Sequence, residues 1–325
     1  MIHPRVLVAA AAFAAFTSLP AGVAAGSPID PAAEALAAKA QAILDQVDRG
    51  PAALDEAEAA IKASLAKGLN AHALVERARL EMIRGEESPQ SLRAAKDSLY
   101  LAEATDAKYD RIYVLRAYVS MKMGNMGMAE ISLRRAEALH TTDPWFKLNA
   151  AMYHLHTGEL DKAWKMREEV AFSDTKNPAA LWSALRELED YYEAREDRAN
   201  LDRIYKRLVV LWPQEAYLRG DYGRAVITQF ADFDAGERAA EEALAIMDYL
   251  HAHQTVSLAL YGRWAAAKRD GKDLATVRAL LDKARAYDPD AAMVPTCALE
   301  SPHLFFVRDA LAALDAKYDP TLHNC

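Results

Sequence analysis

Apolar residues recur at helical intervals along most of this chain, in segments separated by short polar turns. Between Tyr109 and Met123 the apolar positions fall on one face of a helix, at Ile112, Leu115, Val119 and Met123. Gly124 and Asn125 then end the segment, because glycine accepts left-handed backbone geometry. Residues 128–139 form a second amphipathic segment. The pattern predicts pairs of helices joined by tight turns.

The next segments repeat this arrangement. Residues 145–156 predict a first helix, Gly158 a turn and residues 160–172 a second helix. Asp143 is placed to cap the first of these helices, with Pro144 at its first position.

Small residues return at a fixed interval. Ala95, Ala129 and Ala163 lie 34 residues apart, and so do Gly124 and Gly158. A period of this size is typical of stacked helical hairpins, each too small to bury its apolar face alone. The sequence therefore predicts an all-α solenoid.

In these features the chain resembles the tetratricopeptide repeat family, whose units are 34-residue helix-turn-helix hairpins. Ala117 and Ala151 match the small position of the family's first helix, and Ala129 and Ala163 match that of the second. The resemblance implies a right-handed α-solenoid over residues 26–301, clearest in 71–177 and divergent in 178–289. Residues 302–325 are then expected to form a C-terminal capping helix and tail.

The first 25 residues have a different character. Arg5 precedes an apolar run from Val6 to Phe16, and small residues lead to Ala25. This pattern predicts a secretory signal peptide that is cleaved after Ala25. A retained membrane anchor is the alternative, but the run is short for a hydrocarbon core of about 30 Å. We expect a periplasmic or secreted protein with no inserted segment after cleavage.

The composition is that of a folded, acidic protein. The 325 residues are 52% hydrophobic and 26% charged, with a net charge of −8. Loss of the single charge of Arg5 with a signal peptide would leave −9. An acidic protein is a poor candidate for binding nucleic acid or anionic lipid.

The two cysteines, Cys297 and Cys325, both lie near the C-terminus. In an oxidising compartment they are candidates for a disulfide bond, and two unpaired thiols are the alternative.

Motifs for catalysis, metal or cofactor binding do not emerge. His154 and His156 are two residues apart, as are His251 and His253, so each pair points to opposite sides of a helix and cannot chelate one ion. Paired acids such as Glu168 and Glu169 fit a solvated helix surface. We expect no enzyme, no metal and no cofactor.

The resemblance implies that first helices line a concave groove for a protein or an extended peptide. Matched position by position, that groove would include Arg111, Tyr118, Met121, Trp145, Leu148, Met152, His156, Trp182 and Arg186. Tryptophan, tyrosine and arginine are the residues that most often dominate binding energy. The alternative for Trp145 and Trp182 is that they fill gaps between neighbouring hairpins.

A scaffold that binds another protein or peptide is therefore the first hypothesis. An accessory subunit or enzyme of cell-envelope polysaccharide assembly or breakdown is the second, and a structural, self-associating array is the third. The partner, the pathway and the oligomeric state are left open.

The alanine columns give a first prediction. Ala129→Leu or Ala163→Leu should lower the free energy of unfolding by about 1 to 3 kcal/mol, because a larger side chain overpacks the helix contact. Lys122→Ala should have a small effect. Equal thermal melting temperatures for all three variants would contradict the assignment of the contact columns.

Overall fold

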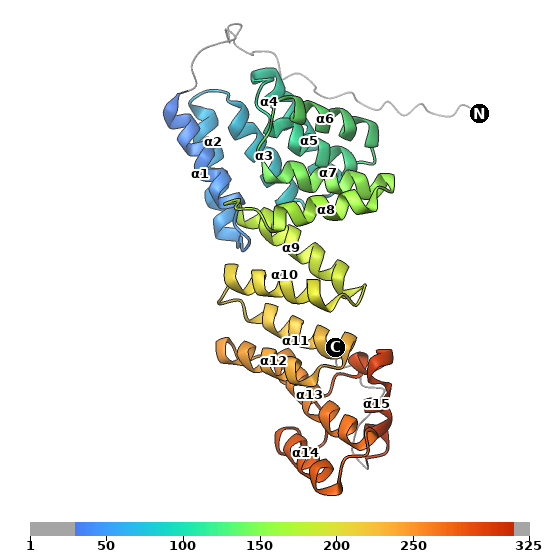
Figure 1. Ribbon diagram of the computed structural model, residues 1–325. Helices are drawn as coiled ribbons and strands as arrows, with labels where there is room; N and C mark the ends of the chain where they lie inside the picture. The colour runs from blue at the N-terminus through green and yellow to red at the C-terminus, as the bar shows by residue number, and fades with distance from the viewer. Residues whose placement is uncertain (1–29, 315–325) are drawn as a thin grey trace, which may run out of the picture. The chain divides into compact units, whose positions relative to one another are not determined.

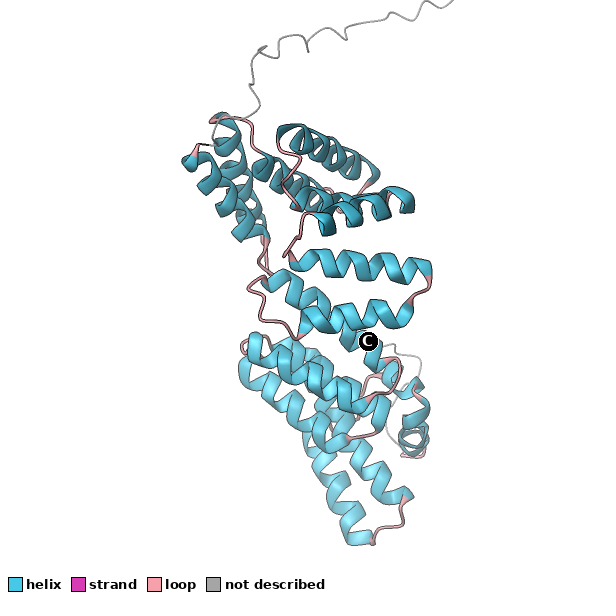
Figure 2. Ribbon diagram, turned by 45° about the horizontal axis from the view of Figure 1, so that its top comes forward, coloured by secondary structure: helices cyan, strands magenta, loops and turns pink. Residues whose placement is uncertain are grey.

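The protein is a succession of helices joined by short connections (Figures 1 and 2). The structure is a computed structural model that describes residues 30–314, so the predicted signal peptide and Cys325 lie outside the described residues. Within them the α-helices are α1 (Pro31–Leu44), α2 (Pro51–Ala66), α3 (Ala71–Arg84), α4 (Pro89–Thr105), α5 (Arg111–Lys122), α6 (Met126–Ala138), α7 (Pro144–Thr157), α8 (Leu160–Ala171), α9 (Pro178–Glu193), α10 (Arg198–Leu211), α11 (Ala216–Phe230), α12 (Phe233–Ile246), α13 (Leu250–Arg269), α14 (Leu274–Tyr287) and α15 (Phe305–Ala312). Two short 3-10 helices, η1 (Thr296–Glu300) and η2 (Pro302–Leu304), precede α15.

The chain forms two compact units, and their boundary lies between Phe146 and Lys147, inside α7. In unit 1, which ends at Phe146, α1 packs on α2, α3 on α4 and α5 on α6, and the first helices α1, α3 and α5 are neighbours. In unit 2, which begins at Lys147, consecutive helices from α8 to α14 pack on one another, and the first helices α11 and α13 also touch. The fold class is all-α, built of stacked, tetratricopeptide-like helix-turn-helix repeats, as predicted.

Small residues allow the two helices of a hairpin to approach closely. Ala95, Ala129 and Ala163 are each fully buried, with 0% exposure. In the α11–α12 hairpin a Cβ atom on Gly223 would lie 2.9 Å from the carbonyl oxygen of Gly236. That distance is too short for a real Cβ atom, so this contact requires glycine.

Glycine also forms the predicted turns. Gly124 and Gly158 have φ values of +75° and +84°. After Gly158 the Glu159 N–H donates to the His154 carbonyl at 2.8 Å, and Asn125 does the same to Ser120 at 2.8 Å. This pattern satisfies carbonyl groups that the helix end would otherwise leave without partners.

Several other turns use the same geometry without glycine. Glu86, His140, Glu196 and Ala231 have φ between +46° and +57°. At Glu196 the following Asp197 N–H donates to the Tyr192 carbonyl at 3.0 Å, which repeats the glycine turn. A left-handed conformation costs an L-residue roughly 1 to 2 kcal/mol. These turns are therefore held by the helices on either side of them.

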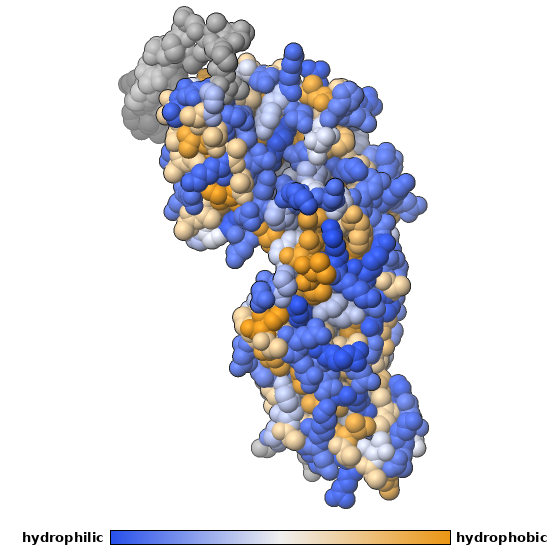
Figure 3. Space-filling view, turned by 60° about the vertical axis from the view of Figure 1, so that its left-hand side comes forward, coloured by the Kyte–Doolittle hydropathy of each residue, from blue (hydrophilic) through white to orange (hydrophobic). Residues whose placement is uncertain are grey.

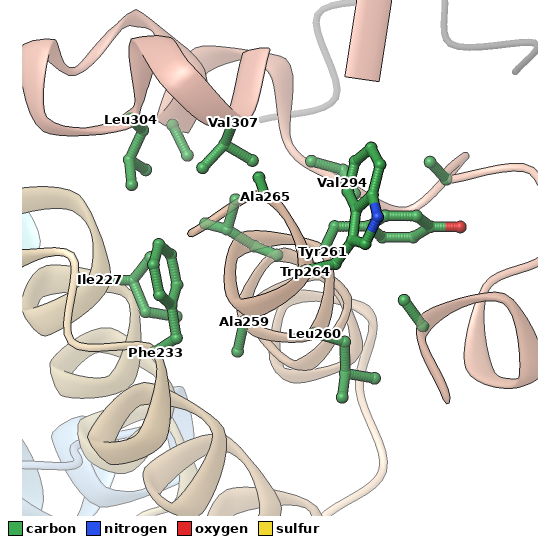
Figure 4. Packing of buried hydrophobic residues seen from close by; sticks show 14 of the residues in the cluster. Ile227, Phe233, Ala259, Leu260, Tyr261, Trp264, Ala265, Val294, Leu304 and Val307 are labelled. Carbon is green, nitrogen blue, oxygen red and sulfur yellow. The ribbon is translucent and has the colours of Figure 1, made fainter. Parts of the chain in front are cut away.

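The C-terminal segment, residues 288–312, folds back onto unit 2. We predicted a capping helix and tail over residues 302–325, and the described part of this range forms η2 and then α15, which packs on α13 and η1. Leu304, Val307 and Leu311 are fully buried. Figure 4 shows Leu304 and Val307 directed toward Ala265 of α13 and toward Phe233. The Ser301 hydroxyl also donates to the Thr228 carbonyl of α11 at 2.5 Å.

The left-handed turns give opposite expectations for two matched changes. His140 is exposed and has φ +57°, so His140→Gly should raise the free energy of unfolding by about 0.5 to 1 kcal/mol through release of backbone strain. Gly158→Ala should lower it by about 1 kcal/mol, since φ is +84° and a Cβ atom there meets nothing within 4 Å. Urea unfolding measures both values. Changes of the same sign would contradict this account of the turns.

Candidate partner-binding surface

Arg111, one of the residues predicted to line a groove, is mostly enclosed in unit 1. It is 9% exposed, and its guanidinium lies 2.7 Å from Asp143 Oδ2 and 3.0 Å from Glu76 Oε1. Burial alone would lower the pKa of Arg111, but Glu76 and then Asp143 outweigh burial and raise it above its ordinary value. Arg111 therefore stays charged and is held by internal ion pairs.

These ion pairs belong to a larger buried network. Arg79 pairs with Glu76 at 2.6 Å and with Asp45 at 2.7 Å. Glu76 is completely buried. Asp143 also accepts a hydrogen bond from the Trp145 N–H at 2.9 Å, which is the predicted cap of α7. Removing one member would leave a buried charge without a partner, a loss that typically costs about 3 to 5 kcal/mol.

The other predicted residues of unit 1 are also engaged within the unit. The Tyr118 hydroxyl donates to the Glu87 carboxylate, and the Lys122 ammonium lies 5.5 Å from the Tyr118 ring centre. Met121 is 6% exposed. Trp145 is half-buried and packs against the apolar core of the unit. This contact is the packing role that was the alternative for Trp145.

In unit 2 the predicted residues differ in exposure. Leu148 is buried, Met152 is half-buried and His156 is exposed. Trp182 and Arg186 lie on α9, one turn apart and both half-buried. The Trp182 ring meets the Trp212 ring edge-on with centres 4.9 Å apart, and the Arg186 guanidinium lies 5.9 Å from the centre of Trp182.

A second aromatic pair joins the next two hairpins. Tyr217, near the start of α11, meets Tyr249 edge-on with ring centres 4.8 Å apart. The Tyr249 hydroxyl donates to the Ala216 carbonyl at 3.3 Å, and it lies 2.0 Å from the point where Gly220 would carry a Cβ atom. Tyr217 is 53% exposed, and Leu250, next to Tyr249 in the chain, is 65% exposed.

We call Trp182, Trp212, Tyr217 and Tyr249 the aromatic surface. Its two pairs are connected through Asp221 on α11. The Arg186 guanidinium lies 3.5 Å from the Asp221 carboxylate, and Asp221 is the charge with the largest effect on the pKa of Tyr249. Burial, and then Asp221, raises the pKa of Tyr249 to about 12. Figure 3 shows one face of the protein, on which apolar residues gather in small patches between polar ones.

Glu189 lies on α9, three residues after Arg186. It is 4% exposed and pairs with Arg186 at 2.6 Å. Burial raises the pKa of Glu189 to about 7, although Arg186 opposes the shift. His251 on α13 is half-buried, and burial followed by the charge of Arg224 lowers its pKa. Both groups therefore carry less charge near neutral pH than they would in water.

Sequence reasoning selected Trp182 and Arg186 for this surface but did not select Trp212, Tyr217 or Tyr249. One signal was present, because Tyr217 is the second residue of α11 just as Trp145 is the second residue of α7. Tyr249 precedes its helix, where periodicity gives no information.

Residues 30–314 also contain histidine, cysteine and acidic side chains outside this surface. Within that range no group of three or more histidine, cysteine or acidic side chains is placed to hold a metal ion. The helices of that range are all too short or too polar to cross a membrane. Cys297 lies half-buried in η1, and its predicted bridge to Cys325 involves a residue outside the described range.

Neither a protein-family model nor a curated protein matches this chain. Among solved structures it is similar to a chain of the APC/C hetero-tetramer Cut9–Hcn1, with 14% identity, 70% of this chain and 46% of that chain covered, and a TM-score of 0.48. This chain thus spans less than half of that relative.

Two further structures are similar over more of the chain. Human IFIT1, in a dimer with PPP-AAAA, has 16% identity, covers 87% of this chain and 70% of its own, and gives a TM-score of 0.46. The TPR2AB domain of yeast Sti1, in a complex with pHSP90, has 15% identity. That match covers 85% of this chain and 98% of the Sti1 chain, with a TM-score of 0.30. Similarities this low in identity and TM-score assign no partner to this chain.

Glu189 predicts a pH dependence of stability. Its pKa is about 7 in the folded protein against an ordinary value of 4.5, so the folded state binds the proton more tightly. The stability due to the protonated carboxyl is complete below the ordinary value and is lost as the pH rises through about 7. The loss is on the order of 2 to 3 kcal/mol between pH 5 and pH 8.

Glu189→Gln should remove most of this loss, which urea unfolding at the two pH values measures. Glu137→Gln, an exposed change on α6, should keep the wild-type pH dependence. The same dependence in the Glu189→Gln variant and the wild type would show that this carboxyl does not titrate as stated.

Proposed function

We propose that this protein is a periplasmic or secreted scaffold that binds another protein or an extended peptide through the aromatic surface of unit 2. The proposal is one of binding without catalysis. The observation that supports it most directly is the exposure of Tyr217, at 53%, beside the edge-on Tyr249 ring. Half-exposed aromatic rings that are held rigidly lose little conformational freedom when a partner covers them.

The neighbouring side chains suit the same role. Trp182 and Trp212 supply a second rigid pair, and Leu250 adds an exposed aliphatic group at 65%. Contiguous apolar side chains surrounded by polar ones are typical of interaction sites. The groove predicted from the resemblance included the enclosed Arg111 and Met121, so the proposal now rests on unit 2.

Export is part of the proposal and rests on the sequence. The positive Arg5, the apolar run to Phe16 and the small residues before Ala25 support a cleaved signal peptide. Cell fractionation and N-terminal sequencing of the purified protein test it. A mature chain that still begins at Met1 in the cytoplasm would exclude export.

Photo-crosslinking tests the surface. A photoreactive residue placed at Trp212 in intact cells should give a discrete adduct, and Tyr217→Ala with Leu250→Ala should reduce its yield at least fivefold. Both side chains are exposed, so the melting temperature should change little.

The matched control is Tyr100→Ala with Leu101→Ala, an adjacent tyrosine and leucine on α4 that are 44% and 41% exposed. This variant should leave the adduct unchanged. If it lowers the yield as much as the unit 2 variant does, or if neither variant lowers it, the aromatic surface is not the binding site.

A further inference from the structure

Charge around the aromatic surface is strongly unbalanced. Acidic groups on α9, on α11 and in the connections before α11 and α13 outnumber basic ones, with Asp190, Glu193, Glu215, Asp221 and Asp248 against Arg186, Arg219 and Arg224. The remaining nearby titratable groups are His251, whose pKa is lowered, and His253, which lies 2.6 Å from Asp248. The surface is therefore negative near neutral pH.

The available positive charge is largely used within the unit. Arg186 lies between Glu189 at 2.6 Å and Asp221 at 3.5 Å and is stacked over Trp182. By contrast the Asp248 side chain is 87% exposed, and Asp190 is also exposed. Burial and the neighbouring acidic group Asp190 both raise the pKa of Glu193, which fits a local excess of negative charge.

An exposed tyrosine ring near a surplus of carboxylates is suited to a cation on a flexible side chain. The ring face attracts an ammonium or guanidinium group, and the carboxylates add direct electrostatic attraction. An acidic or phosphorylated segment would meet repulsion instead. The exposed Leu250 offers an apolar contact next to the rings.

From this juxtaposition we propose that the aromatic surface binds an extended protein segment in which lysine or arginine alternates with apolar residues. One cation lies against Tyr217, one helical turn from the carboxylate of Asp221. Further cations of the segment are attracted by the exposed carboxylates of Asp190 and Asp248, and the apolar residue covers Leu250 and the neighbouring ring. This inference rests on the proposed function and specifies the chemistry of the partner.

Binding of synthetic peptides tests the proposal. The probe is a fluorescein-labelled peptide of sequence Gly-Lys-Phe-Lys-Leu-Lys-Gly, compared with two peptides in which glutamine or glutamate replaces every lysine. Fluorescence anisotropy with the purified protein should show at least tenfold tighter binding of the lysine peptide than of the glutamine peptide. The glutamate peptide should bind more weakly still, and added sodium chloride should weaken the lysine complex.

Variants separate the surface from the net charge of the protein. Asp190→Asn with Asp248→Asn should weaken binding of the lysine peptide at least fivefold and leave the glutamine peptide unaffected. Asp97→Asn with Glu137→Gln removes two exposed charges from unit 1 and should leave both affinities unchanged. Equal loss in the two double variants would overturn the proposal, since it would indicate attraction to net charge alone.

Two other outcomes also overturn the inference. Equal binding of the lysine and glutamine peptides would mean that charge does not select the partner, and no binding of the lysine peptide would exclude this class of ligand. In either case the proposed function is judged separately, by whether the unit 2 variant still loses the crosslinked adduct.

Discussion

The close approach of two helices within each hairpin is the constraint on which the rest of this structure depends. It is possible only where side chains are very small, as at the fully buried Ala129 and at Gly223 facing Gly236. Once the helices are this close, their remaining residues are fixed in direction, and first helices of successive hairpins become neighbours. The aromatic surface is a result of that order, because its rings come from separate hairpins.

The two units use their first helices differently. In unit 1 a buried network of ion pairs lies on α3 and α5. Its charged side chains pair with one another and are enclosed, and they are Glu76, Arg79 and Arg111 with Asp45 and Asp143. In unit 2 the corresponding helices keep aromatic rings at the surface and an excess of carboxylates around them. The C-terminal segment of unit 2 covers part of α13, and its Ser301 hydroxyl donates to the Thr228 carbonyl of α11.

Sequence periodicity was sufficient for the hairpins, because alanine and glycine at fixed spacing leave few other ways to pack. It failed at turns such as that at Glu196, where the left-handed residue is not glycine and only the flanking helices hold the backbone. The family resemblance implied that Arg111 lines a groove, and no local pattern reveals that Glu76 and Asp143 approach it. Trp182 and Arg186 were selected because they match first-helix positions of the resembled family, whereas Tyr249 lies in a connection and its contact with Tyr217 is not visible in the sequence.

Gly220 has a consequence beyond its own helix. The Tyr249 hydroxyl occupies the position where any other residue would carry its first carbon atom. A single added methyl group would turn this ring away from Tyr217 without replacing any of the four aromatic side chains. The shape of the aromatic surface is thus encoded partly by an absent atom, since a change at position 220 alone would move one of its rings.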